Sequence, residues 1–346
     1  MPPARSHLVA VASVALCTVA LTGCNANADR APAAADDGRS LILVTPEPVG
    51  VNPFLQLAVK GVEDAAAQHG ASSKVFQSQD ATTVQQQVEA AVAEQPDVLA
   101  VVGFEFADSI AAAATANPDQ QFLFVDACTT EQFPNVTCAV FREHEATFLA
   151  GVEAGLLTTT NKVGAVVALD TPQIRRFSDP FGAGAAHVNP QVSFTPLYVG
   201  GPSPFNDPAR AKEQALSLAA QSVDQVIASS AAGNLGVFDA AKQSGFAAFG
   251  VDVDQCGLAP GQVVDNVIKE VDRVTADGVE KILAGQGGTT VSYGLAEGGV
   301  TLTGLEEGLA QTQCVIAQHP DVQAELARVR DQIVSGEVRV DDPAGV

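Results

Sequence analysis

Short apolar runs alternate with stretches of helical periodicity along most of the chain, and this alternation is the feature that most constrains its fold. Apolar runs predict strands, and apolar residues that recur three or four positions apart predict the helices between them. The predicted strands span residues 40–45, 73–76, 98–102, 122–125, 163–169, 192–199, 223–228, 247–251 and 289–293. The predicted helices span residues 53–69, 82–94, 106–116, 143–158, 172–187, 208–221, 234–244 and 263–283. Strands that alternate with helices of this length form parallel sheets with helices on both faces.

The alternation restarts near residue 141, which predicts two α/β lobes. A chain of 346 residues is also long for a single core. The first series covers residues 40–140 and the second covers 141–251. What remains is too small for a third core, so we expect residues 252–305 to return and complete the first lobe, leaving a C-terminal tail with a helix over 306–346. Several crossings between lobes predict a hinged clamp with its ligand cleft at the carboxyl ends of the strands.

Residues 1–23 have the pattern of an export signal. Arg5 precedes an apolar run over 8–21 that is too short and too rich in small residues for a comfortable membrane span. The run ends in Leu-Thr-Gly before Cys24, which resembles a bacterial lipobox. We expect cleavage before Cys24 and acyl chains on its sulfur, holding the protein at the outer face of the membrane; a plain signal peptide that contains a cysteine is the alternative. Residues 24–39, rich in Ala, Asp and Pro, predict a flexible tether.

Four further cysteines follow the signal, and an even number in an exported chain favours disulfides. They are Cys128, Cys138, Cys256 and Cys314. Four cysteines allow three pairings; we favour Cys128 with Cys138, which closes a short loop, and Cys256 with Cys314. A zinc site is the weaker alternative, because no pair has C-x-x-C spacing and the His residues lie far from the cysteines in sequence. We therefore predict no bound metal.

The formal net charge of −22 argues against nucleic acid and anionic lipid headgroups as partners. The sequence also lacks the motifs G-x-S-x-G, H-E-x-x-H and G-x-x-x-x-G-K-[ST] of common enzyme classes. No His falls at the end of a predicted strand. We therefore expect a protein that binds a ligand without a cofactor and without transforming it.

Two aspartates directly follow predicted strands, where open α/β sheets bind ligands. Asp126 follows the strand 122–125 and is either a ligand-binding residue or a turn residue. Asp252 follows the strand 247–251, and three interpretations compete for it. Its carboxylate could accept hydrogen bonds from ligand hydroxyls, cap the adjoining loop, or join Asp254 in an acid pair or metal site. We favour ligand binding for Asp126 and Asp252.

Two aromatic residues and one turn are further candidates. Phe54 begins the helix after the first strand, and Phe177 lies in the helix after the strand 163–169. In a chain with no Trp and two Tyr, Phe rings are the candidate stacking platforms, although most Phe residues belong to a core. Gly233 lies in a turn of small residues that either lets a ligand approach the backbone or allows ordinary helix–strand packing.

The run Phe141–Gly151, FREHEATFLAG, resembles a signature of the basic membrane protein family, whose members are purine-nucleoside-receptor-like lipoproteins that serve ABC importers. Further matches follow in the same order within residues 40–305. They are Gly164–Ala168 with Pro172–Phe177, Asn189–Val192, Tyr198–Gly200, Asn206–Pro208 with Lys212, Leu235–Lys242, Gly250–Gln255, and Tyr293–Leu295 with Gly298–Val300. The resemblance implies a type I periplasmic-binding fold, in agreement with the two predicted lobes, and a purine nucleoside as ligand.

The resemblance also implies roles for individual residues. Phe54 and Phe177 would sandwich the purine, and Asp126 would read an edge of the base. Asp252 would hold the ribose hydroxyls with assistance from Lys269, which we place in the long helix 263–283. Gly233 would offer backbone contacts to the ligand.

One corner of the sequence departs from the family pattern. An Asp usually stands shortly before the first helix, but residues 49–54 contain none, and Asn52 is the nearest polar substitute. An Asn donates as well as accepts, so ligand specificity at this corner is expected to differ.

These observations predict a monomeric, lipid-anchored solute-binding protein on the extracellular face, which delivers a purine nucleoside to an ABC permease in the membrane. The same clamp binding a different solute, such as a sugar or a signal molecule, is the alternative. A nucleoside-cleaving enzyme that uses Asp252 and Asp254 is a more remote one.

Overall fold

The computed structural model describes residues 38–80 and 82–345. The predicted signal peptide, the lipid site at Cys24 and the tether up to residue 37 lie outside the described residues. Among the residues described, no helix is both long and apolar enough to cross a membrane.

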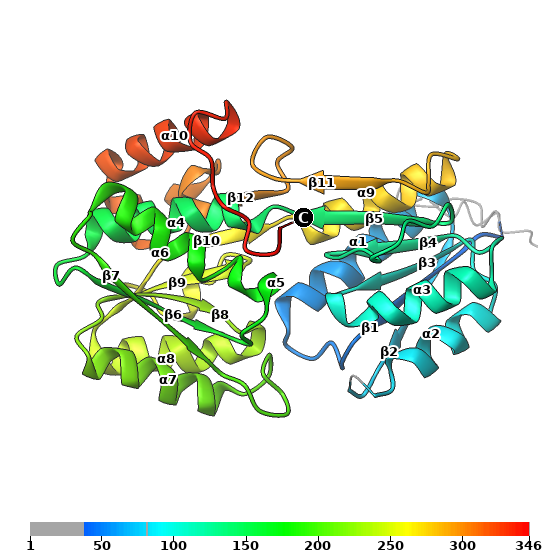
Figure 1. The fold of residues 1–346 in the computed structure, drawn as a ribbon, viewed down its shortest axis with the longest axis horizontal. Helices are drawn as coiled ribbons and strands as arrows, with labels where there is room; N and C mark the ends of the chain where they lie inside the picture. The colour runs from blue at the N-terminus through cyan, green and yellow to red at the C-terminus, as the bar shows by residue number, and fades with distance from the viewer. Residues whose placement is uncertain (1–37, 81, 346) are drawn as a thin grey trace, which may run out of the picture. The chain divides into compact units, whose positions relative to one another are not determined.

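The first sheet has six strands in the order β11-β5-β4-β3-β1-β2, and all neighbouring pairs are parallel (Figure 1). Its strands are β1 (Ser40–Thr45), β2 (Ser72–Gln77), β3 (Val98–Val102), β4 (Phe122–Val125), β5 (Val136–Phe141) and β11 (Thr290–Tyr293). Its helices are α1 (Pro53–His69), α2 (Val84–Ala93), α3 (Ala107–Ala116) and α9 (Val271–Leu283), with the 3-10 turn η1 (Phe104–Phe106) after β3.

Alternate residues of the first sheet are buried on opposite faces. Leu41 and Leu43 of β1 belong to the core that includes residues of α1, whereas Ile42 and Val44 belong to a second core with residues of α2. Successive strand side chains point to opposite faces of a sheet. The continuous apolar run SLILVT is therefore explained by helices covering both faces.

The second sheet has the order β12-β10-β9-β8-β6-β7, and only β12 runs antiparallel to its neighbour. Its strands are β6 (Lys162–Val167), β7 (Ser193–Tyr198), β8 (Gln225–Ser229), β9 (Ala247–Asp252), β10 (Val263–Lys269) and β12 (Val300–Leu302). Its helices are α4 (Glu143–Leu157), α5 (Pro172–Arg175), α6 (Asp179–Val188), α7 (Pro208–Ala220), α8 (Asn234–Ser244) and α10 (Pro320–Val334). Short 3-10 turns lie at Ala231–Gly233 (η2), Cys256–Leu258 (η3), Thr303–Leu305 (η4), Leu309–Gln311 (η5) and Val315–Gln318 (η6).

Helices α4 and α6 pack closely because glycines lie at their contact. A Cβ at Gly184 of α6 would lie 2.0 Å from the carbonyl oxygen of Phe148, and a Cβ at Gly151 of α4 would lie 2.1 Å from that of Phe181. Backbone therefore meets backbone at these two positions. The run over 141–151, which carries the family resemblance, therefore also contributes to the packing of two helices.

Within residues 38–345, apart from the undescribed residue 81, the chain passes from one sheet to the other three times. It crosses between β5 and α4, between β10 and α9, and between β11 and β12. Several crossings were predicted from the sequence. There are three because β5 and β11 belong to the first sheet, whereas β10 and β12 belong to the second.

The prediction of one long helix over 263–283 was wrong. Residues 263–269 form strand β10, and only 271–283 are helical. The predicted return of 252–305 to the first sheet is consequently correct for α9 and β11 but not for β10 and β12, which belong to the second sheet. The polar pair Asp265 and Asn266 gave this stretch a helical appearance, although both are fully buried in the strand.

Two smaller differences concern segments near the crossings. The predicted helix 172–187 is broken at residues 176–178 into α5 and α6. Strand β5, which had not been predicted, completes the first series just before the first crossing.

The cysteine sulfurs lie in two pairs at bonding distance, Cys128 with Cys138 and Cys256 with Cys314, which is the pairing favoured from the sequence. The carboxylate of Asp254 gathers with the second pair, and such a cluster could in principle hold a metal ion. Because the two sulfurs are paired with each other, they leave no thiolate for a metal.

Candidate functional site

A cavity of about 290 Å³ lies where the carboxyl ends of strands from both sheets meet. This volume is close to the lower end of the range of ligand pockets, about 300–1,000 Å³. The lining residues come from segments that follow β1, β2, β3 and β4 of the first sheet and β6, β7 and β8 of the second, and from the last residues of β8, β9 and β10. Of the predicted site residues, Asn52, Phe54, Asp126, Phe177, Asp252 and Lys269 line it.

Two Phe rings flank the inner end of the cavity, near the crossings. The ammonium nitrogen of Lys269 lies 5.0 Å from the ring centre of Phe54 and 5.7 Å from that of Phe177. Phe54 is placed at the start of α1, whereas Phe177 lies in the break between α5 and α6. The unpredicted break therefore determines where Phe177 lies at the cavity wall.

A second aromatic pair joins segments of the two lobes. Phe104 of η1 and Phe205, in the loop after β7, have ring centres 6.5 Å apart, and both line the cavity. Sequence reasoning missed both residues. Phe104 follows a predicted strand and could have been found by that rule, whereas nothing in the sequence singles out Phe205.

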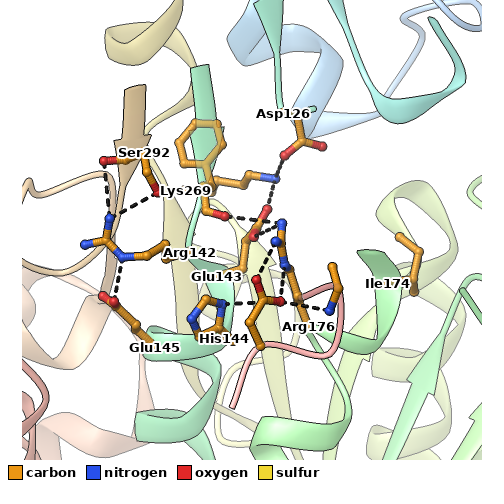
Figure 2. Close-up of polar contacts among 12 residues, drawn as sticks. Asp126, Arg142, Glu143, His144, Glu145, Ile174, Arg176, Lys269 and Ser292 are labelled. Atoms are coloured by element: carbon orange, nitrogen blue, oxygen red, sulfur yellow. Dashed lines mark hydrogen bonds and ion pairs between the residues drawn. The ribbon is translucent and has the colours of Figure 1, made fainter. Parts of the chain in front are cut away.

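Lys269 is the last residue of β10, and its buried ammonium joins two carboxylates. It forms an ion pair with Asp126 and another with Glu143, the latter at 2.7 Å between Nζ and Oε1 (Figure 2). Asp126 follows β4 of the first sheet, and Glu143 begins α4 directly after the first crossing. Lys269 therefore ties the two lobes together at the inner end of the cavity.

The chain of charges continues away from the cavity. The guanidinium of Arg176 lies 3.6 Å from the carboxylate of Glu143 (Figure 2). It also makes two contacts of 2.7 Å with Asp342 in the C-terminal tail. The ring of His144 lies 3.9 Å from the same Asp342 carboxylate. Glu143, His144 and Arg176 were not singled out as site residues, although all three lie in the motifs that carry the family resemblance.

Burial and neighbouring charges shift the pKa values of this network in opposite directions. Burial raises the pKa of Asp126 to about 7, against the attraction of the Lys269 ammonium. Burial also acts to raise the pKa of Glu143, but Lys269 and Arg176 together outweigh it and hold that pKa below its usual value. Burial acts to lower the pKa of Lys269, and the carboxylates of Asp126 and Glu143 outweigh it and raise that pKa. Lys269 is therefore a fixed positive charge.

Asp252 presents a buried carboxylate to the cavity with no partner of its own. It is 7% exposed, and within the described residues its side chain makes no hydrogen bond or ion pair. Burial raises its pKa to about 6, partly offset by Lys269. Its φ of +72°, like that of +75° at Asp126, is uncommon for a residue other than glycine. An unpartnered buried carboxylate at a cavity wall indicates a place for a ligand that donates hydrogen bonds.

The polar groups of Asn52 are already engaged. Its side-chain oxygen accepts hydrogen bonds from the backbone N–H groups of Phe54 and Leu55, so Asn52 caps α1. Its amide nitrogen donates to the carboxylate of Glu47 at 3.2 Å, and Glu47 lines the cavity. Asn52 thus positions an acidic residue that sequence reasoning missed.

The structure does not bring Gly233 or Asp254 to the cavity wall. The N–H of Gly233 donates to the carbonyl oxygens of Ser230 and Phe205, and Ser229 and Ala231 line the cavity in its place. The carboxylate of Asp254 accepts hydrogen bonds within its own loop, including one of 2.9 Å from the N–H of Cys256. An Asp252–Asp254 acid pair facing a ligand, as a nucleoside-cleaving enzyme would need, is therefore not formed.

Two parallel-sheet lobes with a cavity at their strand ends define a class of proteins that bind a small ligand between two lobes. A family described as ABC transporter substrate-binding protein PnrA-like matches residues 39–342. The chain belongs to this family, and the expected membership in the basic membrane protein family is confirmed.

Known relatives agree with this assignment, and a solved structure agrees with the fold. The chain is 28% identical to the "ABC transporter nucleoside-binding protein BmpA" of Lactococcus lactis, over 97% of this chain and 99% of the relative. It is 29% identical to "Basic membrane protein A" of Borreliella burgdorferi, over 58% of this chain and 61% of that protein. An ABC transporter solute-binding protein from Aeropyrum pernix has a similar structure, with a TM-score of 0.77 at 24% identity, covering 88% of this chain and 94% of that one. This likeness confirms the predicted two-lobed fold.

Proposed function

We propose that this protein binds a purine nucleoside outside the cell and delivers it to the permease of an ABC importer. The observation that carries the proposal is the unpartnered carboxylate of Asp252, buried in the same cavity as the rings of Phe54 and Phe177. A flat aromatic base stacks on Phe rings, and ribose hydroxyls donate hydrogen bonds to a carboxylate. The nucleoside-binding relative from Lactococcus lactis, similar over nearly its full length, supports the same ligand class.

Each polar residue at the inner end has a role in this proposal. Asp252 accepts hydrogen bonds from the ribose hydroxyls, and Asp126 accepts from an edge of the base. Lys269 holds Asp126 in place through their ion pair and partly offsets the negative charge of Asp252. No covalent chemistry is required of any of these groups.

Ligand binding is proposed to close the two lobes about the three crossings. Asp126 lies on the first lobe and Asp252 on the second, so a ligand that contacts both is held best when the lobes are together. Such differential affinity is what shifts a protein between open and closed states. The closed protein is then the form that the permease recognises.

Anchoring through acyl chains on Cys24 places the protein at the outer face of the membrane in this proposal. Export also fits the two cysteine pairs, which we propose to be disulfides. Detergent-phase partitioning of the full chain and of a Cys24→Ser variant tests the anchor: the variant moves to the aqueous phase. Partitioning that is equal for both proteins refutes the lipid site.

Calorimetric titration tests the ligand class. The protein without residues 1–24 is unfolded, refolded to remove carried-over ligand, and titrated with adenosine, guanosine, inosine, uridine and several sugars. We expect submicromolar binding of at least one purine nucleoside and much weaker binding of uridine and of the sugars. A protein that binds a sugar and no nucleoside would refute the ligand class while leaving the family assignment intact.

A further inference from the structure

A row of carboxylates extends from the inner end of the cavity along the edge of the first sheet. The neighbouring strands β4, β3, β1 and β2 are followed by lining acids, in that order Asp126, Glu105, Glu47 and Asp80. Neighbouring strands are about 4.8 Å apart, so Glu105 and Glu47 lie one and two strands beyond Asp126, toward the outer end. Across the cavity, the second lobe contributes mainly apolar residues here, namely Leu169, Pro202, Pro204 and Phe205.

The local backbone fixes the position of Glu105. It lies in η1, directly after β3 and Gly103. Gly103 has a φ of +104°, and a Cβ at this residue would lie 2.6 Å from Oε2 of Glu105. The carboxylate therefore rests over the glycine backbone at the cavity wall, in space that only a glycine leaves open.

The carboxylate of Glu47 is also held in place, in this case by the side-chain amide of Asn52 at 3.2 Å. Burial raises the pKa of Glu47 above its usual value, and burial together with the nearby Glu47 raises the pKa of Glu105 to about 7. The carboxyl groups of Glu47 and Glu105 therefore lie near each other in a partly buried place. Ionising both is unfavourable there unless a hydrogen-bond donor compensates their negative charges.

Among the described residues of the cavity wall, no cation compensates these two acids. Lys269 is committed to Asp126 and Glu143, and Arg176, which does not line the cavity, is committed to Glu143 and Asp342. In the described part of the chain, the side chain of Glu105 has no hydrogen bond or ion pair with another side chain. Beyond the Asn52 amide at Glu47 and the backbone N–H of Glu105 itself, a ligand in this cavity would supply the further donor, and the unpartnered Asp252 independently indicates such a ligand.

We propose that Glu105 and Glu47 form a second subsite, at the outer end of the cavity, which accepts hydrogen bonds from an amino group on the ligand. The proposal rests on the proposed function and narrows it to nucleosides whose base carries an exocyclic amine. With carboxylates at the inner and the outer end of the cavity, ligands that carry a phosphate are also disfavoured, because the negative phosphate would lie against negative side chains. From the sequence, Asn52 was expected to alter the ligand specificity of this corner. The geometry indicates instead Glu47, the acid whose carboxylate Asn52 holds.

Matched ligands test the subsite. Adenosine and guanosine carry an exocyclic amine, and inosine has the same purine and ribose without one. We expect wild-type protein to bind at least one of the two amino nucleosides about tenfold or more tightly than inosine, the size of effect of a hydrogen bond to a charged group. In Glu105→Ala and in Glu47→Ala the preference falls below about threefold, while inosine affinity changes little.

The control variant is Glu89→Ala, which removes an exposed carboxylate from α2, away from the cavity, and keeps the wild-type preference. Circular dichroism confirms that each variant is folded. Equal binding of inosine and both amino nucleosides by wild-type protein overturns the subsite and leaves the nucleoside proposal standing. A preference that survives in Glu105→Ala and Glu47→Ala also overturns it. Failure to bind any nucleoside overturns the proposed function, and this inference with it.

Discussion

Asp252 is the residue on which ligand recognition depends most directly in our proposal. Replacing its carboxylate with an amide in Asp252→Asn keeps the shape but removes a charged acceptor, and a hydrogen bond to a charged group contributes about 1.5–3 kcal/mol. We expect the affinity for the preferred nucleoside to fall by about tenfold or more in calorimetric titrations. The affinity for the corresponding 2′,3′-dideoxynucleoside should change little. Asp254→Asn, outside the cavity, is the control, and an equal loss for both ligands would contradict the role in hydroxyl binding.

The same residue should make the empty protein less stable above pH 6. The pKa of Asp252 is about 6 in the folded protein because of burial, partly offset by Lys269, and about 3.9 in an unfolded chain. The folded state therefore binds the proton more tightly, and stability falls as the pH rises from about 4 to about 6. Asp252→Asn should remove this penalty and raise the free energy of unfolding by about 3 kcal/mol at pH 7.5. Urea titrations at pH 7.5 and at pH 4 measure the difference; a gain of equal size at both values would contradict it.

How far the sequence predicts the site also depends on single residues. Asp126 and Asp252 were found because they directly follow predicted strands, and the same rule applies to Glu105, which follows β3. Nothing in the local sequence indicated Glu47 as a binding residue, because its position at the cavity depends on Asn52, which caps α1 and holds the Glu47 carboxylate. Gly233 was expected to contact the ligand, but its N–H is taken by Ser230 and Phe205. Such contacts depend on loop geometry that no local pattern encodes.

At the scale of elements, most strands and helices were predicted within two residues, and the largest error, at β10, has a physical cause. The run that forms β10 contains Asp265, whose carboxylate accepts the N–H groups of Asn266 and Gly304. The amide of Asn266 donates to Thr303 at 3.1 Å. Gly304 and Thr303 lie more than thirty residues away in the chain, so the local sequence shows two polar residues without these partners. A strand with polar residues at its centre was therefore read as the first part of helix α9.

The contact between α4 and α6 yields a prediction at this same scale. Alanine favours helices over glycine by about 1 kcal/mol, so Gly184→Ala would stabilise an isolated α6. In the protein the new methyl would meet the backbone of Phe148, and we expect the free energy of unfolding to fall by about 3 kcal/mol. The control is Ala183→Gly, at the neighbouring exposed position, which should cost about 1 kcal/mol through helix propensity alone. Urea unfolding midpoints compare them, and a Gly184→Ala protein as stable as wild type would refute the close contact.

At the scale of the whole molecule, the charge network connects the C-terminal tail to the ligand cavity. Asp342 holds Arg176, which faces Glu143, and Glu143 pairs with Lys269 at the cavity wall. Arg176 also directly precedes Phe177, one of the two rings proposed to stack on the base. Asp342 itself does not line the cavity, and its ion pair with Arg176 connects it to Glu143 and so to the cavity wall.

Asp342→Asn tests that connection. Loss of the Asp342 charge leaves the buried guanidinium of Arg176 with only part of its compensation, and breaking a buried pair is strongly destabilising, by about 3 kcal/mol when no group replaces the lost partner. Since an amide still accepts one hydrogen bond, we expect a loss of about 1–2 kcal/mol in the free energy of unfolding. Nucleoside affinity should also weaken severalfold, because Arg176 then draws Glu143 away from Lys269. The matched control is Asp341→Asn, which removes the same charge from the neighbouring, exposed residue and should change neither quantity. If Asp342→Asn lowers stability but leaves affinity at the wild-type value, the tail braces the fold without acting on the cavity.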